Sequence, residues 1–450
     1  MSDRTRADAV YAALLRRQGE QWVQPRVERT ARLLTYLDDP QRTYRVIHVT
    51  GTNGKTSTSR IIESIVRATG LRTGLFTSPH LERFTERVMI DGEPIEDGLI
   101  ADAWDEIEPF VDIVDAELQA SGDAPLTFFE LLTVLAFVAF ADAPVDVAVI
   151  EVGMGGSWDS TNTADGDVAV FAPIDIDHAD RLGDTIAEIA TVKSGIIKTG
   201  AAAVSAEQDP AALAVLQSAA AGRGATLAVE GDAFGLSAQS LAVGGQQISV
   251  KGLAGTYDEL YLPLYGAHQG HNAALAIAAV EALIGGATQA LATDVVADGL
   301  AQVTSPGRLQ LVGVAPTVLV DSAHNPHGAR SLVQALGDSF DFDEWGLVLG
   351  AFGDKDIAGI VSTLAPAATH VFATAPDSER SAEPDAIADL VEAAGAQVTV
   401  HRDLAEAAEA AREWASSSER RAVVIAGSVV LAGEALQLAA DEDWKDGWQR

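Results

Sequence analysis

The stretch that most constrains the fold of this chain runs from Tyr44 to Gly70. It begins with a short β-branched run, Val46, Ile47 and Val49, of the kind that fills a buried parallel strand. The glycine-rich segment Gly-Thr-Asn-Gly-Lys-Thr follows at once, and apolar residues then recur at helical spacing up to a glycine suited to a C-terminal cap. Strand, tight loop and helix in this order predict an α/β fold built on a parallel sheet.

The loop in this stretch has the features of a phosphate-binding loop. Gly51 and Gly54 allow backbone N–H groups to close around an anion, and the start of the following helix adds partial positive charge. Lys55 is placed to reach the β- and γ-phosphates of a nucleotide, and Thr56 to bind Mg²⁺. The longer common pattern has glycine at the position of Val49, so a turn without a ligand is the alternative. The nucleotide site predicted from this loop consists of Gly51, Thr52, Asn53, Gly54, Lys55 and Thr56.

Composition narrows the class of protein. The chain has 450 residues, with 65 acidic and 30 basic side chains and a net charge of -35, which argues against nucleic acid or an anionic membrane as a partner. It contains no cysteine, so disulfides, thiol catalysis and thiolate metal sites are excluded. The first residues are charged throughout, unlike a signal peptide, and the apolar stretch 131–141 is too short to span a bilayer. We therefore expect a cytoplasmic monomer with small-molecule substrates.

The chain divides near residues 304–307, Thr-Ser-Pro-Gly, where the α/β alternation stops and then restarts. We predict a P-loop-type parallel-sheet ATPase domain over 1–304 and a smaller Rossmann-like doubly wound α/β domain over 305–450. In the first domain, 126–140 is expected to be a buried helix and 226–265 to be strand-rich. Strands of the second domain are expected at 317–320, 346–349, 370–373, 397–400 and 422–425.

Two strands of the first domain end in polar residues. Glu151 lies near the end of the apolar strand 147–152, and the next strand ends in an Asp-Ile-Asp-His segment that contains His178. Because the carboxyl ends of parallel strands share one edge of a sheet, both side chains could converge on the phosphates near Lys55, with Glu151 holding Mg²⁺. A lone histidine is more often structural. Lys193, on the helix that follows, is by its local pattern a solvated lysine on a helix face.

In the second domain, the segment Asp-Ser-Ala-His-Asn-Pro at 321–326 closes a strand and opens a helix. Asn325 suits the N-cap and Pro326 the first turn, so a capped helix start explains the pattern without function. The alternative is a polar cluster that faces the first domain across a cleft, where two-domain enzymes bind ligands. Arg308, just after the break, could add positive charge there.

Ordered motifs along nearly the whole chain resemble those of the bacterial dihydrofolate synthase/folylpolyglutamate synthase family, within the Mur-ligase superfamily. The phosphate loop alone would indicate only the superfamily. The matching segments include IHVTGTNGKTS (47–57), TSPHLERFTERVMIDGEPI (77–95), EVGMGGSWDSTN (151–162), KSGIIK (193–198), HQGHNAALA (268–276), SPGRLQ (305–310) and DSAHNPHG (321–328).

The resemblance implies an enzyme that uses ATP and Mg²⁺ to join dihydropteroate or a reduced folate to L-glutamate. ATP would phosphorylate the acid to an acyl phosphate, which the amine then attacks. The residues that the resemblance assigns fall into four groups. Lys55, Lys193 and His324 are catalytic; Ser78, Glu151 and His178 hold one metal, and a carbamylated Lys193 helps to hold a second; Asn272, Arg308 and Asp321 bind the nucleotide from the far side; Thr127, Phe129, Trp158 and Asp159 form the pterin pocket. Ser78 has no signal of its own in the sequence.

Three positions depart from the family pattern. Ser157 stands where arginine is usual, and Val192 where glutamate commonly precedes the modified lysine. Thr56 replaces a glycine that is common after the loop lysine. The first departure bears on the pterin pocket and the second on the surroundings of Lys193.

Two other functions remain open at this point. A Mur-type ligase could add an amino acid to a cell-wall nucleotide precursor, but such enzymes usually carry a separate N-terminal domain, and only about 43 residues precede the first strand. A nucleotide-switched binding protein would need only the phosphate loop and would leave the second domain unexplained. Addition of glutamate to one folate substrate or to both is also open.

Overall fold

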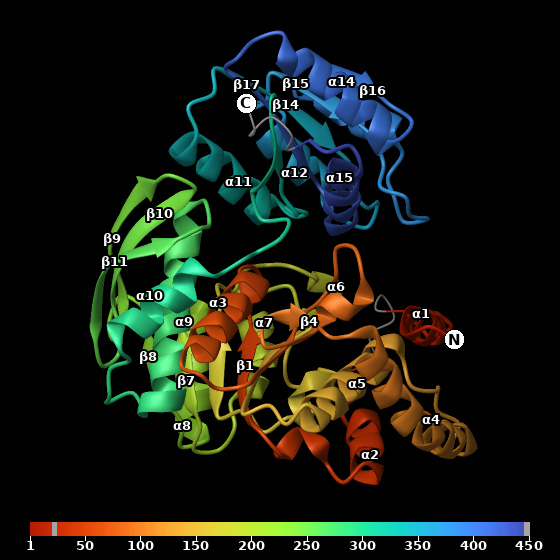
Figure 1. The fold of residues 1–450 in the computed structure, drawn as a ribbon, viewed down its shortest axis with the longest axis vertical. Coiled ribbons are helices and arrows are strands. Elements are labelled where there is room, and N and C mark those ends of the chain that lie inside the picture. The colour runs from red at the N-terminus through yellow and green to blue at the C-terminus, as the bar shows by residue number, and fades with distance from the viewer. Residues whose placement is uncertain (20–24, 445–450) are drawn as a thin grey trace.

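The structure is a computed structural model that describes residues 1–19 and 25–444. Two α/β units follow each other along the chain, one in red to green and one in teal to blue (Figure 1). The N-terminal unit has an eight-stranded sheet in the order β4-β3-β2-β5-β1-β6-β7-β8. Its strands are β1 (Arg45–Thr50), β2 (Thr73–Phe76), β3 (Val88–Ile90), β4 (Glu93–Pro94), β5 (Val147–Glu151), β6 (Val168–Phe171), β7 (Ala202–Ser205) and β8 (Thr226–Val229).

The alternation of side chains along β5 explains how both faces of this sheet are covered. Ala148 and Ile150 point into one apolar cluster, and Val147 and Val149 into another on the opposite face. Helices cover both faces, and the predicted buried helix at 126–140 is confirmed as α5, which is buried on nearly all sides. The helices are α1 (Asp3–Leu15), α2 (Glu28–Tyr36), α3 (Lys55–Ala68), α4 (Asp97–Ala120), α5 (Phe128–Asp142), α6 (Ala179–Leu182), α7 (Ile186–Lys193), α8 (Pro210–Gly222), α9 (Ala267–Gly285) and α10 (Thr293–Ala301).

The strand-rich region predicted at 226–265 is also confirmed. After β8 it forms a separate three-stranded antiparallel sheet in the order β11-β10-β9. Its strands are β9 (Gly235–Ala242), β10 (Gly245–Lys251) and β11 (Thr256–Leu262), and it lies at the edge of the N-terminal unit (Figure 1).

The C-terminal unit contains a six-stranded sheet in the order β12-β13-β17-β14-β15-β16. The five predicted strands are present within a residue or two, and all neighbours except β12 and β13 pair in parallel. The sequence reading missed β12, because Gly313 and the Ala-Pro turn after it interrupt the apolar pattern. The elements are β12 (Gln310–Val314), β13 (Thr317–Val320), α11 (Pro326–Ser339), β14 (Glu344–Leu349), α12 (Ile357–Leu364), β15 (His370–Ala373), α13 (Pro384–Ala393), β16 (Val398–Val400), α14 (Leu404–Ser416), β17 (Arg421–Ala426) and α15 (Val429–Asp441).

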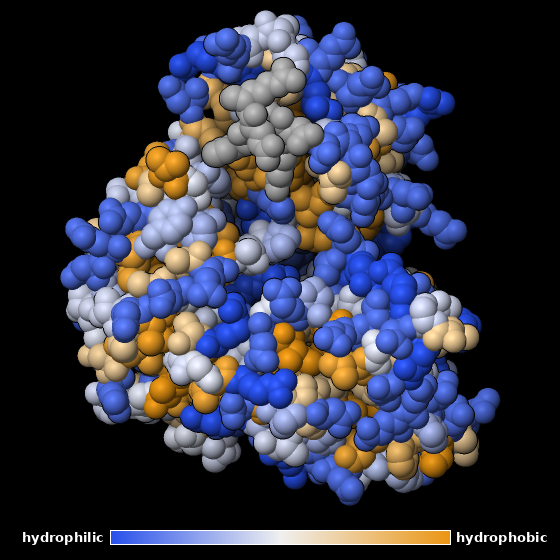
Figure 2. All heavy atoms as spheres, viewed as in Figure 1, coloured by the Kyte–Doolittle hydropathy of each residue, from blue (hydrophilic) through white to orange (hydrophobic). Residues whose placement is uncertain are grey.

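The two units therefore form the predicted pair of a larger P-loop-type sheet and a smaller Rossmann-like sheet. The Thr-Ser-Pro-Gly segment lies between α10 and β12, where the chain passes from one sheet to the other. Figure 2 shows the molecule hollowed between the units, with hydrophilic residues in the recess. Within residues 1–19 and 25–444, no helix combines the length and apolar character needed to cross a membrane.

Candidate active site

The phosphate loop joins β1 to α3 and has the backbone that its two glycines allow. Gly51 and Gly54 have φ values of +155° and +83°, and a Cβ on Gly51 would lie 2.7 Å from Cβ of Ala172. Pro173 fixes the loop from the neighbouring strand end, since its carbonyl oxygen accepts the N–H of Thr52 at 2.8 Å. No side chain caps the N-terminus of α3, so this helix end is available to an anion.

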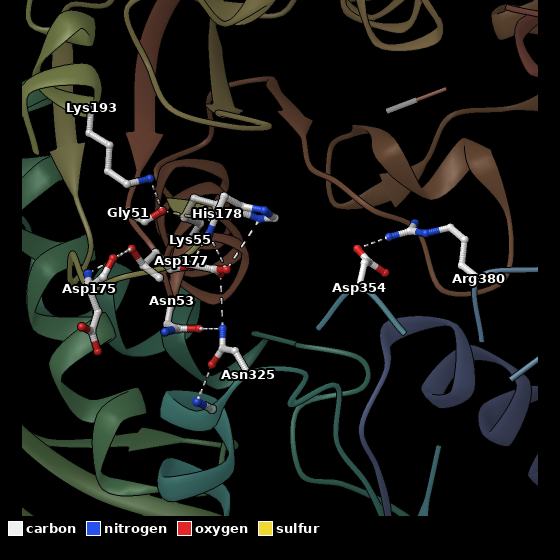
Figure 3. A network of polar contacts seen from close by, with 12 residues as sticks. Gly51, Asn53, Lys55, Asp175, Asp177, His178, Lys193, Asn325, Asp354 and Arg380 are labelled. Carbon is white, nitrogen blue, oxygen red and sulfur yellow. Dashed lines mark hydrogen bonds and ion pairs between the residues drawn. The ribbon is translucent and has the colours of Figure 1, made fainter. Parts of the chain in front are cut away.

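Two lysines meet at one carbonyl group of this loop (Figure 3). The Nζ atom of Lys193 donates to the Gly51 carbonyl oxygen at 2.8 Å, and Nζ of Lys55 donates to the same oxygen at 3.2 Å. Lys193 is only 4% exposed, so the interpretation of Lys193 as a solvated lysine was wrong. Burial lowers the pKa of Lys193 to about 7, and the positive charge of Lys55 contributes. A large part of this amine is therefore uncharged near neutral pH.

On the other side of the loop lies a buried carboxylate. Glu151 is 1% exposed, and its two oxygens accept from the Thr56 hydroxyl at 2.9 and 3.0 Å. The backbone N–H of Ser78 also donates to Glu151. Burial raises the pKa of Glu151, and Lys55 and Thr56 offset this only in part. The structure thus brings Glu151 and Ser78 together, and it places the Thr56 hydroxyl beside them.

His178 lies on the lysine side of the loop (Figure 3). It caps α6 with a left-handed backbone, φ +51°, and its Nε2 is 3.9 Å from Oδ1 of Asp177. Burial lowers the pKa of His178, Asp177 opposes this, and the nearby lysines add to it. Within the described part of the chain, no hydrogen bond or ion pair joins His178 to Glu151 or Ser78.

Of the predicted metal ligands, the structure brings Ser78 and Glu151 together and places His178 beside Asp177 instead. Carboxylate and hydroxyl oxygens are the ligands that Mg²⁺ prefers, and a neutral imidazole keeps a free lone pair. The described residues contain no cluster of three or more His, Asp or Glu that could hold a metal. The predicted metal ligands are one serine, one glutamate and one histidine (Ser78, Glu151 and His178), so they would not form such a cluster.

The C-terminal unit reaches the phosphate loop through Asn325. Its Nδ2 donates to Oδ1 of Asn53 at 3.3 Å and to Oδ2 of Asp177 at 3.5 Å, while its Oδ1 accepts the Gly328 N–H at 2.7 Å (Figure 3). The capped helix start is therefore confirmed, and the same amide also faces the N-terminal unit, as the alternative interpretation expects; ligand binding at this segment stays a prediction. The sequence reading missed His327, whose Nδ1 lies 2.9 Å from Nδ2 of Asn53.

The other predicted nucleotide residues come from both units. Asn272 is buried on α9, and a Cβ on Gly54 would be 2.9 Å from its Oδ1. Arg308 lines a cavity together with Thr56 and residues of both units. Asp321 forms hydrogen bonds within its own unit: its oxygens accept the N–H groups of Leu309 and Ala323, each at 2.8 Å.

His324 is turned toward its own segment. Its Nδ1 lies 2.9 Å from the Ser322 carbonyl oxygen. Burial and then the charge of Lys355 lower the pKa of His324 to about 4. The imidazole is therefore neutral near pH 7, with Nε2 left for another partner.

Three of the four predicted pterin residues lie at the glycine loop after β5. Phe129 packs against the backbone there, since a Cβ on Gly153 would lie 2.5 Å from its ring, and Trp158 packs on Gly155. Thr127 caps α5. Asp159 is buried, and its oxygens accept the N–H of Met154 and of Thr161, each at 2.9 Å. Thr127 and Asp159 therefore have structural partners in addition to any ligand.

Comparison with known proteins also divides the chain into two matching regions. The Mur ligase middle domain matches residues 49–280, and the glutamate ligase domain of Mur ligases matches 307–429. The dihydrofolate synthase/folylpolyglutamate synthase of Mycobacterium tuberculosis is 44% identical over 439 residues, which is 92% of this chain and 90% of that protein. The chain belongs to the dihydrofolate synthase/folylpolyglutamate synthase family. The Bacillus subtilis family member is 35% identical over 76% of this chain and 79% of its own length.

Solved structures of the family share the fold. Folylpolyglutamate synthase of M. tuberculosis complexed with ADP superposes with a TM-score of 0.93 at 42% identity, over 97% of this chain and 99% of that one. The E. coli protein FolC in complex with DHPP and ADP gives a TM-score of 0.83 at 29% identity, over 97% and 98% of the two chains.

Two departures from the family pattern are neighbours in space. The N–H of Ser157 donates to the carbonyl oxygen of Val192 at 2.9 Å, directly before Lys193. A Cβ on Gly195 would lie 2.3 Å from Cβ of Ser157, so the backbones approach closely here. The loop after β5 and the end of α7 are thus joined by a hydrogen bond between these two positions.

Proposed function

We propose that this chain is an ATP-dependent ligase that joins the amine of L-glutamate to the carboxylate of dihydropteroate, and also to that of reduced folates. The family membership supports this, because its relatives carry the names of both activities. The observation that carries the proposal is the convergence of Lys55 and Lys193 on the Gly51 carbonyl, at a phosphate loop that the second unit also contacts.

The chemistry follows from the low reactivity of a carboxylate toward an amine. The substrate carboxylate takes the γ-phosphoryl group of ATP and becomes an acyl phosphate. The glutamate amine attacks its carbonyl carbon, and the tetrahedral intermediate expels phosphate. Lys55 stabilises the charge on the transferred phosphoryl group, and the two units hold the reactants in line.

Mg²⁺ is the proposed cofactor, with Ser78, Glu151, His178 and Thr56 as the residues that would hold it. It supplies neutralisation of the phosphate charge. His324, Asn272, Arg308 and Asp321 are proposed to bind and orient the nucleotide and acyl group from the second side of the recess. Thr127, Phe129, Trp158 and Asp159 are proposed to bind the pterin ring.

Lys193 is proposed to be carbamylated. Its buried amine, with a pKa lowered to about 7, is nucleophilic toward CO₂. The uncharged amine attacks the carbon of CO₂. The N–C bond forms as one C=O π bond opens onto oxygen, and one proton leaves the nitrogen, which would give an anionic carbamate oxygen to hold a second metal. ¹³C NMR after equilibration with labelled bicarbonate tests this, with a carbamate signal expected in the wild type and absent from Lys193→Arg. The same signal in both proteins would refute the assignment.

The test of the function is glutamate addition. Protein is supplied with ATP, Mg²⁺ and L-glutamate, with dihydropteroate and tetrahydrofolate in separate reactions, and products are identified by mass. A glutamate gain on both acceptors is the expected result and means a bifunctional enzyme. A gain on only one narrows the activity to that acceptor. No gain on either, from protein that binds ATP, would refute the folate assignment.

The two alternatives make different predictions for the same assay. A cell-wall ligase would turn over ATP only with a nucleotide precursor, and the folate names of the relatives do not favour it. A nucleotide-switched binding protein would show negligible turnover with every acid.

We also propose a domain boundary at 304/305 and a cytoplasmic monomer, since a net charge of -35 opposes self-association. Light scattering on the eluted protein tests the monomer.

A further inference from the structure

The loop between β2 and β3, residues 77–87, makes an unusually close contact with α15 of the C-terminal unit. A Cβ built on Gly433 would lie 2.1 Å from the carbonyl oxygen of Leu81 and 2.8 Å from its carbonyl carbon. Gly433 is buried inside the helix and does not have a positive φ, so the helix itself does not require glycine there. Glycine is required there because the Leu81 backbone lies too close for a Cβ atom.

The side chain of Leu81 packs closely against a second glycine, Gly307. Its Cδ1 and Cδ2 atoms each lie 3.3 Å from the place where a Cβ on Gly307 would be. Gly307 has φ +65° and lies where the chain passes between the two sheets. Leu81 also packs against the apolar cluster of the C-terminal unit. One residue of the N-terminal unit thus contacts both the connecting segment and α15, which lies at the lower edge of the blue unit in Figure 1.

The loop around Leu81 is held by several hydrogen bonds. The Glu86 carboxylate accepts three successive backbone N–H groups, from Leu81 at 3.0 Å, Glu82 at 3.1 Å and Arg83 at 2.6 Å. The Arg83 side chain is in turn fixed to Asp97 on α4 at 2.5 Å. Leu81 therefore cannot shift without the rest of the loop.

The same loop begins at the carboxylate side of the phosphate loop. Ser78 is three residues before Leu81 and donates its N–H to Glu151. A displacement of Leu81 by α15 would thus be transmitted to Ser78 over a short, hydrogen-bonded segment. Leu81, which contacts the C-terminal unit, is thus three residues along the chain from the N–H donor to Glu151.

We propose that the notch formed by Gly307 and Gly433 is the positioning contact that aligns the two units for reaction. Leu81 and Gly433 touch no substrate and act through the loop that carries Ser78. This inference rests on the proposed function, because it assigns to the contact the alignment of an acyl phosphate with an amine. Small misalignments are costly in such a transfer.

The test compares Gly433→Ala with Gly337→Ala. Both glycines lie inside helices of the C-terminal unit and both substitutions raise helix propensity, but nothing lies within 4 Å of a Cβ on Gly337. For Gly433→Ala we expect kcat for glutamate addition to fall by about tenfold or more, with the KM for ATP within about twofold of the wild type. Gly337→Ala should keep both constants. Equal kcat in the two variants would overturn the proposal.

A second measurement does not depend on folate chemistry. Hydrogen exchange of the amides in 78–86 should be faster in Gly433→Ala than in Gly337→Ala in the absence of ligands, because the loop loses its seat. If the wild type adds no glutamate to any acceptor, the proposed function fails, and this exchange comparison still decides whether the contact positions the loop. Leu81→Ala, which adds no atoms, should also lower kcat and speed up the exchange of these amides. Unchanged exchange in both Gly433→Ala and Leu81→Ala would refute the positioning role of the contact.

Discussion

The lysine amines and the buried Glu151 carboxylate near the phosphate loop do not form an ion pair with each other. On one side, the amines of Lys55 and Lys193 share the Gly51 carbonyl oxygen. On the other, Glu151 has a hydroxyl and a backbone N–H as its hydrogen-bond donors. No ion pair joins the two sides among the described residues, although Lys55 is near enough to influence both.

The consequence is that burial pushes each side toward its uncharged form. The pKa of Lys193 is lowered to about 7, whereas the pKa of Glu151 is raised. A direct ion pair would have had the opposite effect on both. Such a site is organised for charges that arrive with the substrates, because phosphates can compensate the amines and a divalent cation the carboxylate.

The largest expected effect comes from removing either lysine at the phosphate loop. In Lys55→Ala, we expect turnover of ATP in the glutamate-addition assay to fall by about 10³-fold, because charge stabilisation at the transferred phosphoryl group is lost. In Lys193→Ala we expect a comparable fall, because the proposed carbamate ligand is lost. Lys198→Ala is the matched control, since Lys198 lies just beyond the same helix but donates to the Asn162 carbonyl oxygen. Comparable losses in all three variants would mean that the lysine side has no special role.

Removing the negative charge on the other side should separate activity from stability. In Glu151→Gln the acceptor oxygen for Thr56 remains, but the charge that holds Mg²⁺ does not. We expect the Mg²⁺ concentration for half-maximal turnover to rise by about 10–100-fold. The metal-free protein should gain about 1 kcal/mol of unfolding free energy, because a buried charge without a cation is costly. Denaturant titration measures the second quantity, and a loss of stability would contradict this account.

A smaller effect should follow from cutting the contact between the loop and the second unit. Asn325→Asp keeps the oxygen that caps α11 but loses the donor to Asn53 and places a like charge opposite Asp177. We expect the KM for ATP to rise by about fivefold, the equivalent of one hydrogen bond of about 1 kcal/mol. Asn325→Ala, which also loses the cap, should in addition lower the unfolding free energy by about 1 kcal/mol. If Asn325→Asp left the KM for ATP unchanged, the contact would have no part in nucleotide binding.

Much of this arrangement could be predicted from local sequence patterns. The phosphate loop, the strand with Glu151 and the capped helix start at Asn325 each have a short-range signature, because the residues that make the structure are neighbours in the chain. The strands of the second sheet were found for the same reason. The strand β12 was not, because Gly313 breaks its alternation.

The remainder depends on contacts between distant segments. The burial of Lys193 is created when the end of α7 packs against a loop 142 residues away in the chain, and no local pattern encodes this. Ser78 contacts Glu151 through its backbone N–H, which every residue except proline has, so its side chain gave no signal. Only the family resemblance pointed to these two residues.

The smallest effect tests the opposite case, an acid and a base that do touch. His271 on α9 lies 2.6 Å from Glu230, and this hydrogen bond raises its pKa, where separated groups near the phosphate loop shift toward neutrality. A raised histidine pKa stabilises the fold below the unfolded value of about 6.5 and loses this effect as the pH rises through the folded value. The unfolding free energy of the wild type minus that of His271→Gln should therefore be larger at about pH 6 than at about pH 9. His370→Gln should show the reverse trend, because burial lowers the pKa of His370. Parallel trends in the two variants would show that direct contact with Glu230 is not what sets the sign.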